Sequence, residues 1–152
     1  MSKQKTTLDL EAIKTFLRDY YRSEVDTLQQ MIEGEESQAF SFKWGNAEYV
    51  IRINSSISSF QKDAYAYHHF HSEQVPIPYV IQTGYIDAQH AFCISEKMPG
   101  ITLQDVDSAT LQRLLKPTAD VWLALSKFDP DETTGFGDFD ASGQGDTETV
   151  LT

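Results

Sequence analysis

The sequence predicts an α+β domain with a five-stranded, mainly antiparallel sheet and helices on one side of it. The first observation is the order of the segments: an amphipathic helix, three strands, a second helix and two more strands. The second is the dipeptide Gly45-Asn46, which is typical of a tight hairpin between two strands. The third is the pair Pro76 and Pro78, which requires an extended segment after the second helix.

The first helix is predicted over residues 10–21, where apolar side chains recur three and four positions apart. Asp9 precedes this stripe and is one of the residue types that cap a helix N-terminus. The stripe comprises Leu10, Ile13, Phe16, Leu17, Tyr20 and Tyr21.

Three strands follow, and alternation along the third divides its side chains between two faces of the sheet. The predicted strands cover residues 27–32, 37–44 and 47–54. On the third strand one face carries Tyr49, Ile51 and Ile53. The opposite face carries Val50, Arg52 and Asn54.

A second helix is predicted from Ser58, which is placed to cap it, to residue 71. Gln61 occupies the position three residues later that completes a capping box. Two further strands, over residues 79–85 and 91–97, are separated by a turn at Asp87-Ala88.

The remaining residues have a different character. Residues 103–128 are predicted to be helical, and Pro117 either begins a new helix or kinks a long one. Residues 129–152 contain no Lys or Arg and are rich in acids and glycine, so we expect a loop followed by a disordered tail.

Composition restricts the class of protein. A chain of 152 residues forms one domain or one lobe of a larger one. The formal net charge of −11 disfavours nucleic acid and anionic membranes as partners. A single cysteine excludes an internal disulfide, and we identify neither a signal peptide nor an apolar segment of membrane-spanning length. We therefore expect a cytoplasmic protein.

Arg52 is the residue of greatest functional interest, because an arginine within a strand requires either solvent or an anion. Asp63, on the following predicted helix, is a candidate partner. One interpretation is a solvated charge on a sheet face. The other is a cation held by a helix carboxylate and directed at nucleotide phosphates, as in protein kinases.

Several blocks of sequence, in the same order and with similar spacing, resemble the N-terminal part of the hygromycin-type members of the aminoglycoside phosphotransferase family. The blocks are residues 34–42, 49–54, 62–63, 76–78, 93–95, 100–105 and 135–137. The resemblance implies a protein-kinase-like N-terminal lobe with its hinge strand over residues 1–97. Residues 98–128 would then begin the helical large lobe with one or two helices, and residues 129–152 would be the acidic tail.

The resemblance also implies a nucleotide site. Arg52 matches the phosphate-binding cation of the family, and Asp63 matches the carboxylate that orients it. The segment from Gly34 to Ser37 matches the loop over the phosphates.

The hinge of the family matches residues 95–97 of this chain. At the hinge, we expect the Ser95 carbonyl and the Lys97 N–H to pair with the edge of adenine or guanine.

Catalysis and metal binding are not expected of this chain alone. The complete enzyme would use ATP or GTP with Mg²⁺ to phosphorylate an aminoglycoside hydroxyl, which causes antibiotic resistance. That reaction requires a His-x-Asp-x-x-x-x-Asn loop and a further metal-binding Asp, and the chain has neither. The triplet Asp138-Phe139-Asp140 comes too early and lacks the glycine. We therefore assign no catalytic or metal residue and expect negligible phosphoryl transfer.

Other interpretations stay open. His68 and His71 lie three residues apart on a helix and could share a metal, although no third ligand is spaced to complete a site. Cys93 is interpreted as a buried strand thiol. The chain could instead be a non-catalytic, nucleotide-sensing or protein-binding module, or a truncated product. Its interface with a separate C-terminal lobe, or with a second copy, would be Leu111, Leu115, Trp122 and Leu125.

Overall fold

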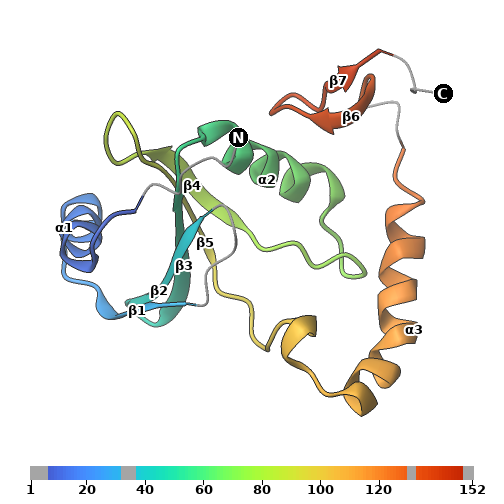
Figure 1. The fold of residues 1–152 in the computed structure, drawn as a ribbon, viewed down its shortest axis with the longest axis horizontal. Coiled ribbons are helices and arrows are strands. Elements are labelled where there is room, and N and C mark those ends of the chain that lie inside the picture. Colours follow the sequence, from blue (N-terminus) through green and yellow to red (C-terminus); the bar gives the residue numbers. More distant parts are fainter. Residues whose placement is uncertain (1–6, 32–36, 130–132, 149–152) are drawn as a thin grey trace.

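The computed structural model describes residues 7–31, 37–129 and 133–148 and contains the predicted five-stranded sheet (Figure 1). Its strands are β1 (Asp26–Gln30), β2 (Gln38–Trp44), β3 (Ala47–Asn54), β4 (Val80–Tyr85) and β5 (Ala91–Glu96). The spatial order is β1-β2-β3-β5-β4, and each neighbouring pair is antiparallel. The predicted hairpin between β2 and β3 is confirmed, with Gly45 in the left-handed region at a φ of 62°.

Helices α1 (Leu10–Tyr21) and α2 (Ile57–Phe70) cover opposite faces of the sheet, so the prediction of helices on one side is wrong. Along β5, every residue from Ala91 to Ser95 is buried. A strand that is buried at consecutive positions has both of its faces covered, and one layer of helices cannot do this.

The larger core lies between α1 and the sheet. Ile13 and Leu17 of α1 are fully buried against it, as the stripe on this helix predicts. The other buried members of this cluster are Val25, Phe40, Phe42, Ile51, Ile53, Phe92 and Ile94. On the opposite face, Phe60 of α2 packs against Ala91 and Cys93.

The predicted start is confirmed for α1, whereas α2 starts earlier than predicted. Helix α1 has the predicted bounds, and the Asp9 side chain accepts a hydrogen bond of 2.7 Å from the Ala12 N–H. Helix α2 begins two residues earlier than predicted, with Ser56 as its N-cap in place of Ser58. Asn54 supports this earlier start, because its side-chain oxygen accepts the Ser56 N–H at 2.8 Å.

The predicted helix over residues 103–128 is divided into a short 3₁₀ helix, Leu103–Asp105, and α3 (Ser108–Leu125). Asp107 caps α3 by accepting the Thr110 N–H at 2.8 Å. Pro117 lies inside α3, so it does not begin a new helix. No described residue of α3 is buried, and the helix extends away from the sheet (Figure 1).

Part of the acidic segment is ordered, which corrects the prediction of a loop and disordered tail over residues 129–152. β6 (Phe136–Phe139) and β7 (Gly145–Thr147) form a two-stranded antiparallel hairpin. The Asp140 carboxylate closes its turn by accepting the N–H groups of Ser142 and Gln144 at 2.8 and 3.1 Å. Acidic and glycine residues that suggest disorder by composition here form a defined turn.

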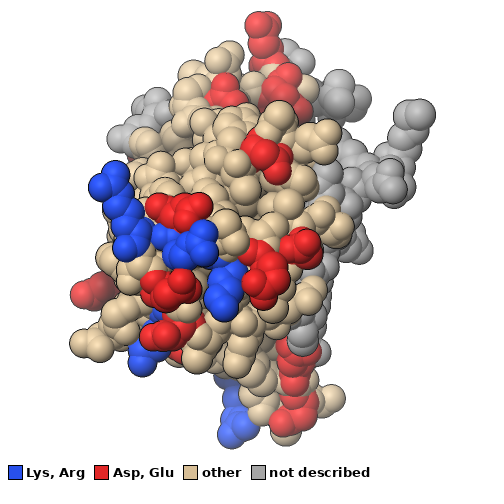
Figure 2. Space-filling view, turned by 90° about the vertical axis from the view of Figure 1, so that its left-hand side faces the viewer, with Lys and Arg blue, Asp and Glu red and all other residues tan. Residues whose placement is uncertain are grey.

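The excess of acidic residues does not produce a uniformly acidic surface. On the face that carries α1, Lys and Arg side chains lie among Asp and Glu side chains (Figure 2). Across the described residues, no helix is long and apolar enough to cross a membrane.

Candidate functional site

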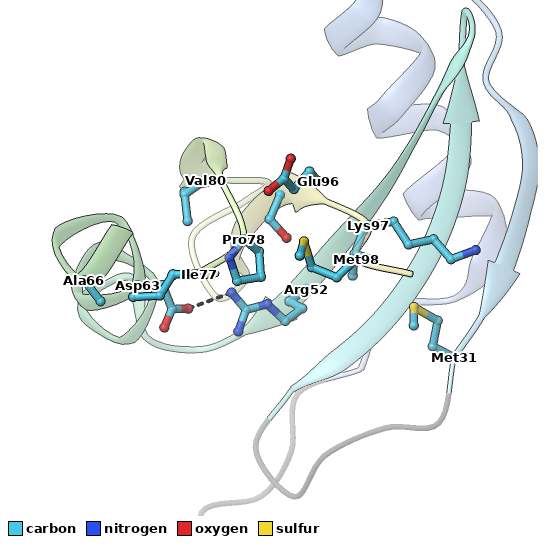
Figure 3. Close-up of a pocket in the computed structure, with 12 residues that line it drawn as sticks. Met31, Arg52, Asp63, Ala66, Ile77, Pro78, Val80, Glu96, Lys97 and Met98 are labelled. Carbon is cyan, nitrogen blue, oxygen red and sulfur yellow. Dashed lines mark hydrogen bonds and ion pairs between the residues drawn. The ribbon is translucent and has the colours of Figure 1, made fainter. Parts of the chain in front are cut away.

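A cavity of about 360 Å³ lies between the α2-facing side of the sheet and the segment that leads into β4 (Figure 3). A volume of this size is within the usual range for small-molecule sites. Its lining residues are Met31, Val50, Arg52, Asp63, Ala66, Ile77, Pro78, Val80, Ser95, Glu96, Lys97 and Met98. Four of the six predicted nucleotide-binding residues are therefore brought together in one cavity.

The predicted pair of Arg52 and Asp63 is formed. The Arg52 Nη2 donates to Asp63 Oδ2 at 2.6 Å (Figure 3). It also donates to Cys93 Sγ at 3.5 Å. The guanidinium carbon also lies 5.4 Å from the centre of the Phe60 ring, a cation–π distance. Burial by itself would lower the pKa of Arg52, but Asp63 and Cys93 together outweigh this effect and the pKa is raised. Arg52 is therefore a fixed cation at the edge of the cavity.

The local sequence explains how this pair forms. Helix α2 begins two residues after β3 ends, so its first turns return over the strand that carries Arg52. Phe60 enters the sheet core one turn before Asp63. Because residues three apart on a helix share a face, the burial of Phe60 directs Asp63 toward the same side.

The cavity also has an apolar part beside the cation. Val50 and Ser95 are opposite each other on β3 and β5, and Val80 lies next to Ser95 on β4. Pro78 and Met98 complete the lining at the ends of the neighbouring strands. Apolar side chains of this kind can contact the faces of a flat heterocycle, while Arg52 contacts an anion.

The hinge differs from the sequence prediction. The Lys97 N–H donates to the Glu48 carbonyl oxygen at 3.2 Å, so it is not available for a base. The Tyr79 N–H donates to the Glu96 side-chain Oε1 at 2.9 Å rather than to the Glu96 carbonyl oxygen. No described residue accepts the Met98 N–H. The carbonyl of Glu96 and the N–H of Met98 are therefore better candidates than those of Ser95 and Lys97.

The β3–β5 ladder explains why the Lys97 N–H is already bonded. In an antiparallel pair the N–H and C=O of one residue point to the same neighbour. The ladder continues to Glu48 and Lys97, which directs the N–H groups of alternate β5 residues at β3. The Ser95 side chain still lines the cavity, but its backbone belongs to this ladder.

The two remaining predicted residues are not part of the cavity lining. Ser37 lies beside the end of β3, where its Oγ accepts a hydrogen bond from Asn54 Nδ2 at 3.4 Å. Gly34 lies outside the described residues, as does most of the predicted loop over the phosphates.

Comparison with known proteins identifies relatives with a similar sequence and fold. No protein-family model matches the chain. A curated relative, Hygromycin-B 4-O-kinase of Escherichia coli, is 40% identical over 142 residues, which are 93% of this chain and 41% of the relative. The crystal structure of aminoglycoside phosphotransferase APH(4)-Ia has a TM-score of 0.88 at 40% identity, over 93% of this chain and 47% of that one.

Over nearly its whole length, the chain is similar to the N-terminal part of aminoglycoside phosphotransferases. It spans about half the length of the relatives it matches, in agreement with an N-terminal lobe. A thermostable variant of APH(4)-Ia in a ternary complex with AMP-PNP and hygromycin B has a TM-score of 0.85 at 40% identity. That match covers 91% of this chain and 46% of the other. Another variant, 41% identical with the same TM-score and coverage, contains ADP and hygromycin B.

Metal-ligating side chains do not cluster in the described part of the chain. It contains no group of three or more His, Cys, Asp or Glu side chains that could hold a metal ion. The His71 ring nitrogen Nδ1 lies 2.9 Å from the Ile77 carbonyl oxygen, so His71 has a structural contact. We assign no magnesium contact to these residues.

Cys93 is buried on β5, as its interpretation as a strand thiol predicts. Burial raises the pKa of its thiol, although Arg52 opposes this effect. A thiol that stays protonated is a poor nucleophile, and the Cys93 sulfur instead accepts a hydrogen bond from Arg52 Nη2 at 3.5 Å.

Sequence reasoning did not identify the apolar lining. Val50 was detectable, because alternation along β3 places it on the same face as Arg52. Ala66 and Met98 gave no local signal, since their place in the cavity depends on how α2 and the chain after β5 lie in three dimensions.

Proposed function

We propose that this chain is the nucleotide-binding lobe of an aminoglycoside O-phosphotransferase and that its cavity binds ATP or GTP. The observation that carries the proposal is the Arg52–Asp63 pair, 2.6 Å apart at the edge of a cavity beside the hinge. A guanidinium held by one carboxylate oxygen keeps further N–H groups for phosphate oxygens. The relatives crystallised with AMP-PNP or ADP support nucleotide as the ligand.

The proposal assigns a role to each part of the cavity. Arg52 binds the phosphates, and Asp63 holds Arg52 in place. Val50 and Met98 contact the base, while the Glu96 carbonyl accepts from it and the Met98 N–H donates to it. This arrangement is a positioning device, and positioning with electrostatic stabilisation is most of what phosphoryl transfer requires.

Transfer itself belongs to the complete protein in this proposal. The acceptor would be a hydroxyl of an aminoglycoside of the hygromycin type, and Mg²⁺ would accompany the nucleotide. The sequence contains no catalytic His-x-Asp-x-x-x-x-Asn loop, so the chain alone supplies nucleotide binding and not turnover. We propose a cytoplasmic location, where ATP is present.

Nucleotide binding is the direct test. We expect isothermal titration of the chain with Mg–AMP-PNP to show saturable binding to one site, which ATP displaces. A coupled assay with ATP and hygromycin B should show no turnover above a protein-free control. An absence of binding at millimolar nucleotide would contradict the proposal, and so would turnover that survives removal of host kinases.

A second function is favoured by the exposed apolar side chains of α3. Leu111, Leu115 and Trp122 are 44%, 64% and 68% exposed, whereas Leu125 of the predicted stripe is half-buried. Apolar groups gathered on an exposed helix commonly mark a contact surface. The chain would then act as a binding module, covered by a C-terminal lobe in trans or by a second copy.

Light scattering distinguishes a second copy from a C-terminal lobe as the partner that covers α3. If a second copy covers α3, we expect a concentration-dependent dimer that Trp122→Ser disrupts, because this change removes the largest exposed ring of the helix. Lys116→Ser, on the same helix but not apolar, is the matched control. A monomer at all concentrations would contradict self-association and leave the C-terminal lobe as the proposed occupant.

A further inference from the structure

The β6–β7 hairpin lies against α2, the helix that supplies Asp63 (Figure 1). The Tyr65 ring of α2 is only 7% exposed, yet it is not part of either core cluster of the sheet. Its ring centre lies 5.6 Å from that of Phe139 on β6. A side chain at Gly143, in the hairpin turn, would overlap the Tyr65 hydroxyl and ring. The hairpin therefore buries this side of α2.

A charged contact reinforces the apolar one. The Lys62 ammonium donates to the Asp138 carboxylate of β6. This hydrogen bond lowers the pKa of Asp138, so the pair stays charged well below neutral pH. Lys62 immediately precedes Asp63, so the hairpin contacts the helix at the level of the nucleotide site.

Helix α2 has only two buried side chains among its residues, Phe60 and Tyr65. Phe60 anchors the helix to the sheet, and Tyr65 anchors it to the hairpin. Asp63 lies between these two positions in the sequence. Ile57 packs beside Phe60, and Tyr67 contacts Tyr79, so α2 is also held on the sheet side at other points. A contact on another side of the helix further limits its rotation about its axis. A small rotation would separate Asp63 from Arg52, because a hydrogen bond weakens steeply with distance and angle.

We propose that the β6–β7 hairpin is a positioning element of the nucleotide site. It holds α2 through Tyr65 and Lys62, so that Asp63 keeps the Arg52 guanidinium directed at the cavity. The inference rests on the proposed nucleotide binding and adds residues 136–147 to the groups that determine affinity. The alternative is that the hairpin only covers an apolar ring and has no influence on Arg52.

A double-mutant cycle separates these two cases. Gly143→Ala introduces a methyl group that meets Tyr65, at a φ of 80°. Gly45→Ala is the matched control, because its φ of 62° imposes a similar backbone strain while nothing lies within 4 Å of the added carbon. Each change is made in the wild-type chain and in an Asp63→Asn background, and the affinity for Mg–AMP-PNP is measured by titration.

We expect Gly143→Ala to weaken Mg–AMP-PNP binding about fivefold in the wild-type background and by less than about twofold in the Asp63→Asn background. Gly45→Ala should have only a small effect on the affinity for Mg–AMP-PNP, and this effect should be the same in the two backgrounds. An equal loss for Gly143→Ala in the two backgrounds would overturn the inference, and so would no loss at all. Circular dichroism verifies that each variant is folded.

Amide hydrogen exchange gives a readout that does not need nucleotide. Exchange at the α2 amides should be faster in Gly143→Ala than in Gly45→Ala, because the second anchor of the helix is displaced. Equal exchange in the two variants would overturn the inference. A wild-type chain that fails to bind Mg–AMP-PNP, yet shows this difference in exchange, would contradict the proposed function and support the role of the hairpin in holding α2.

Discussion

Replacing Phe42 with alanine is expected to lower the free energy of unfolding by about 3–5 kcal/mol. The Phe42 ring is 1% exposed on β2 and packs between the sheet and α1. Its ring centre lies 5.9 Å from that of Tyr21 and 5.5 Å from that of Tyr49. Removal of the ring leaves a cavity that these neighbours fill only in part, so transfer and cavity costs add. A domain of this size has about 5–15 kcal/mol of stability in total, and the loss is a large fraction of it.

Urea unfolding followed by far-UV circular dichroism measures this change. Phe136→Ala is the control, because this ring on β6 is 51% exposed and its loss should cost about 0.5 kcal/mol or less. Equal shifts of the unfolding midpoint for the two variants would show that the α1 side of the sheet is not the main core.

Replacing Arg52 with alanine is expected to weaken Mg–AMP-PNP binding about 10- to 100-fold. A loss of this size is typical when a hydrogen bond to a charged group is removed. The change removes the cation of the cavity and leaves the Asp63 carboxylate without its partner. An unpaired carboxylate next to phosphates adds repulsion to the lost attraction. Arg52→Lys should give an intermediate loss, because it keeps the charge but loses the planar fork that matches phosphate oxygens.

Isothermal titration measures the affinities, and Arg113→Ala is the matched control. Arg113 is an exposed arginine on α3 whose Nη2 donates to Thr110 Oγ1, and it does not line the cavity. The affinity of the wild-type chain for Mg–AMP-PNP should fall as the salt concentration rises. The affinity of Arg52→Ala should fall less steeply with salt. Unchanged affinity in Arg52→Ala would mean that the nucleotide, if bound, lies elsewhere on the lobe.

The sequence predicted the central pair of the site because both residues lie within one short unit. Alternation along β3 assigned Arg52 to one face, and the helix that follows the strand places Asp63 over it. Asp63 is only six positions after the first residue of α2, so little freedom remained for another arrangement. The resemblance to a known family identified the same two residues by a separate route.

The hinge and the tail show where such reasoning fails. The hinge assignment did not take into account that the Lys97 N–H is bonded to Glu48, because the register of β5 against β3 decides which N–H groups are free, and register is a contact between distant segments. The acidic segment was expected to be disordered from its composition. Its hairpin is ordered because Asp140 closes a turn and because Tyr65, more than 70 residues earlier in the chain, provides a surface for Phe139.

The amino-acid sequence by itself determined the kinds of elements, most of their bounds, and the pairing of a strand cation with a helix carboxylate. These features depend on periodicity and turn chemistry over a few residues, which are local properties of the chain. Only the tertiary structure decided that the two helices cover opposite faces, that the Lys97 N–H is bonded to Glu48, and that a distant hairpin contacts α2. Each of these depends on which surfaces meet when the core closes, and that is determined by packing between segments far apart in the chain.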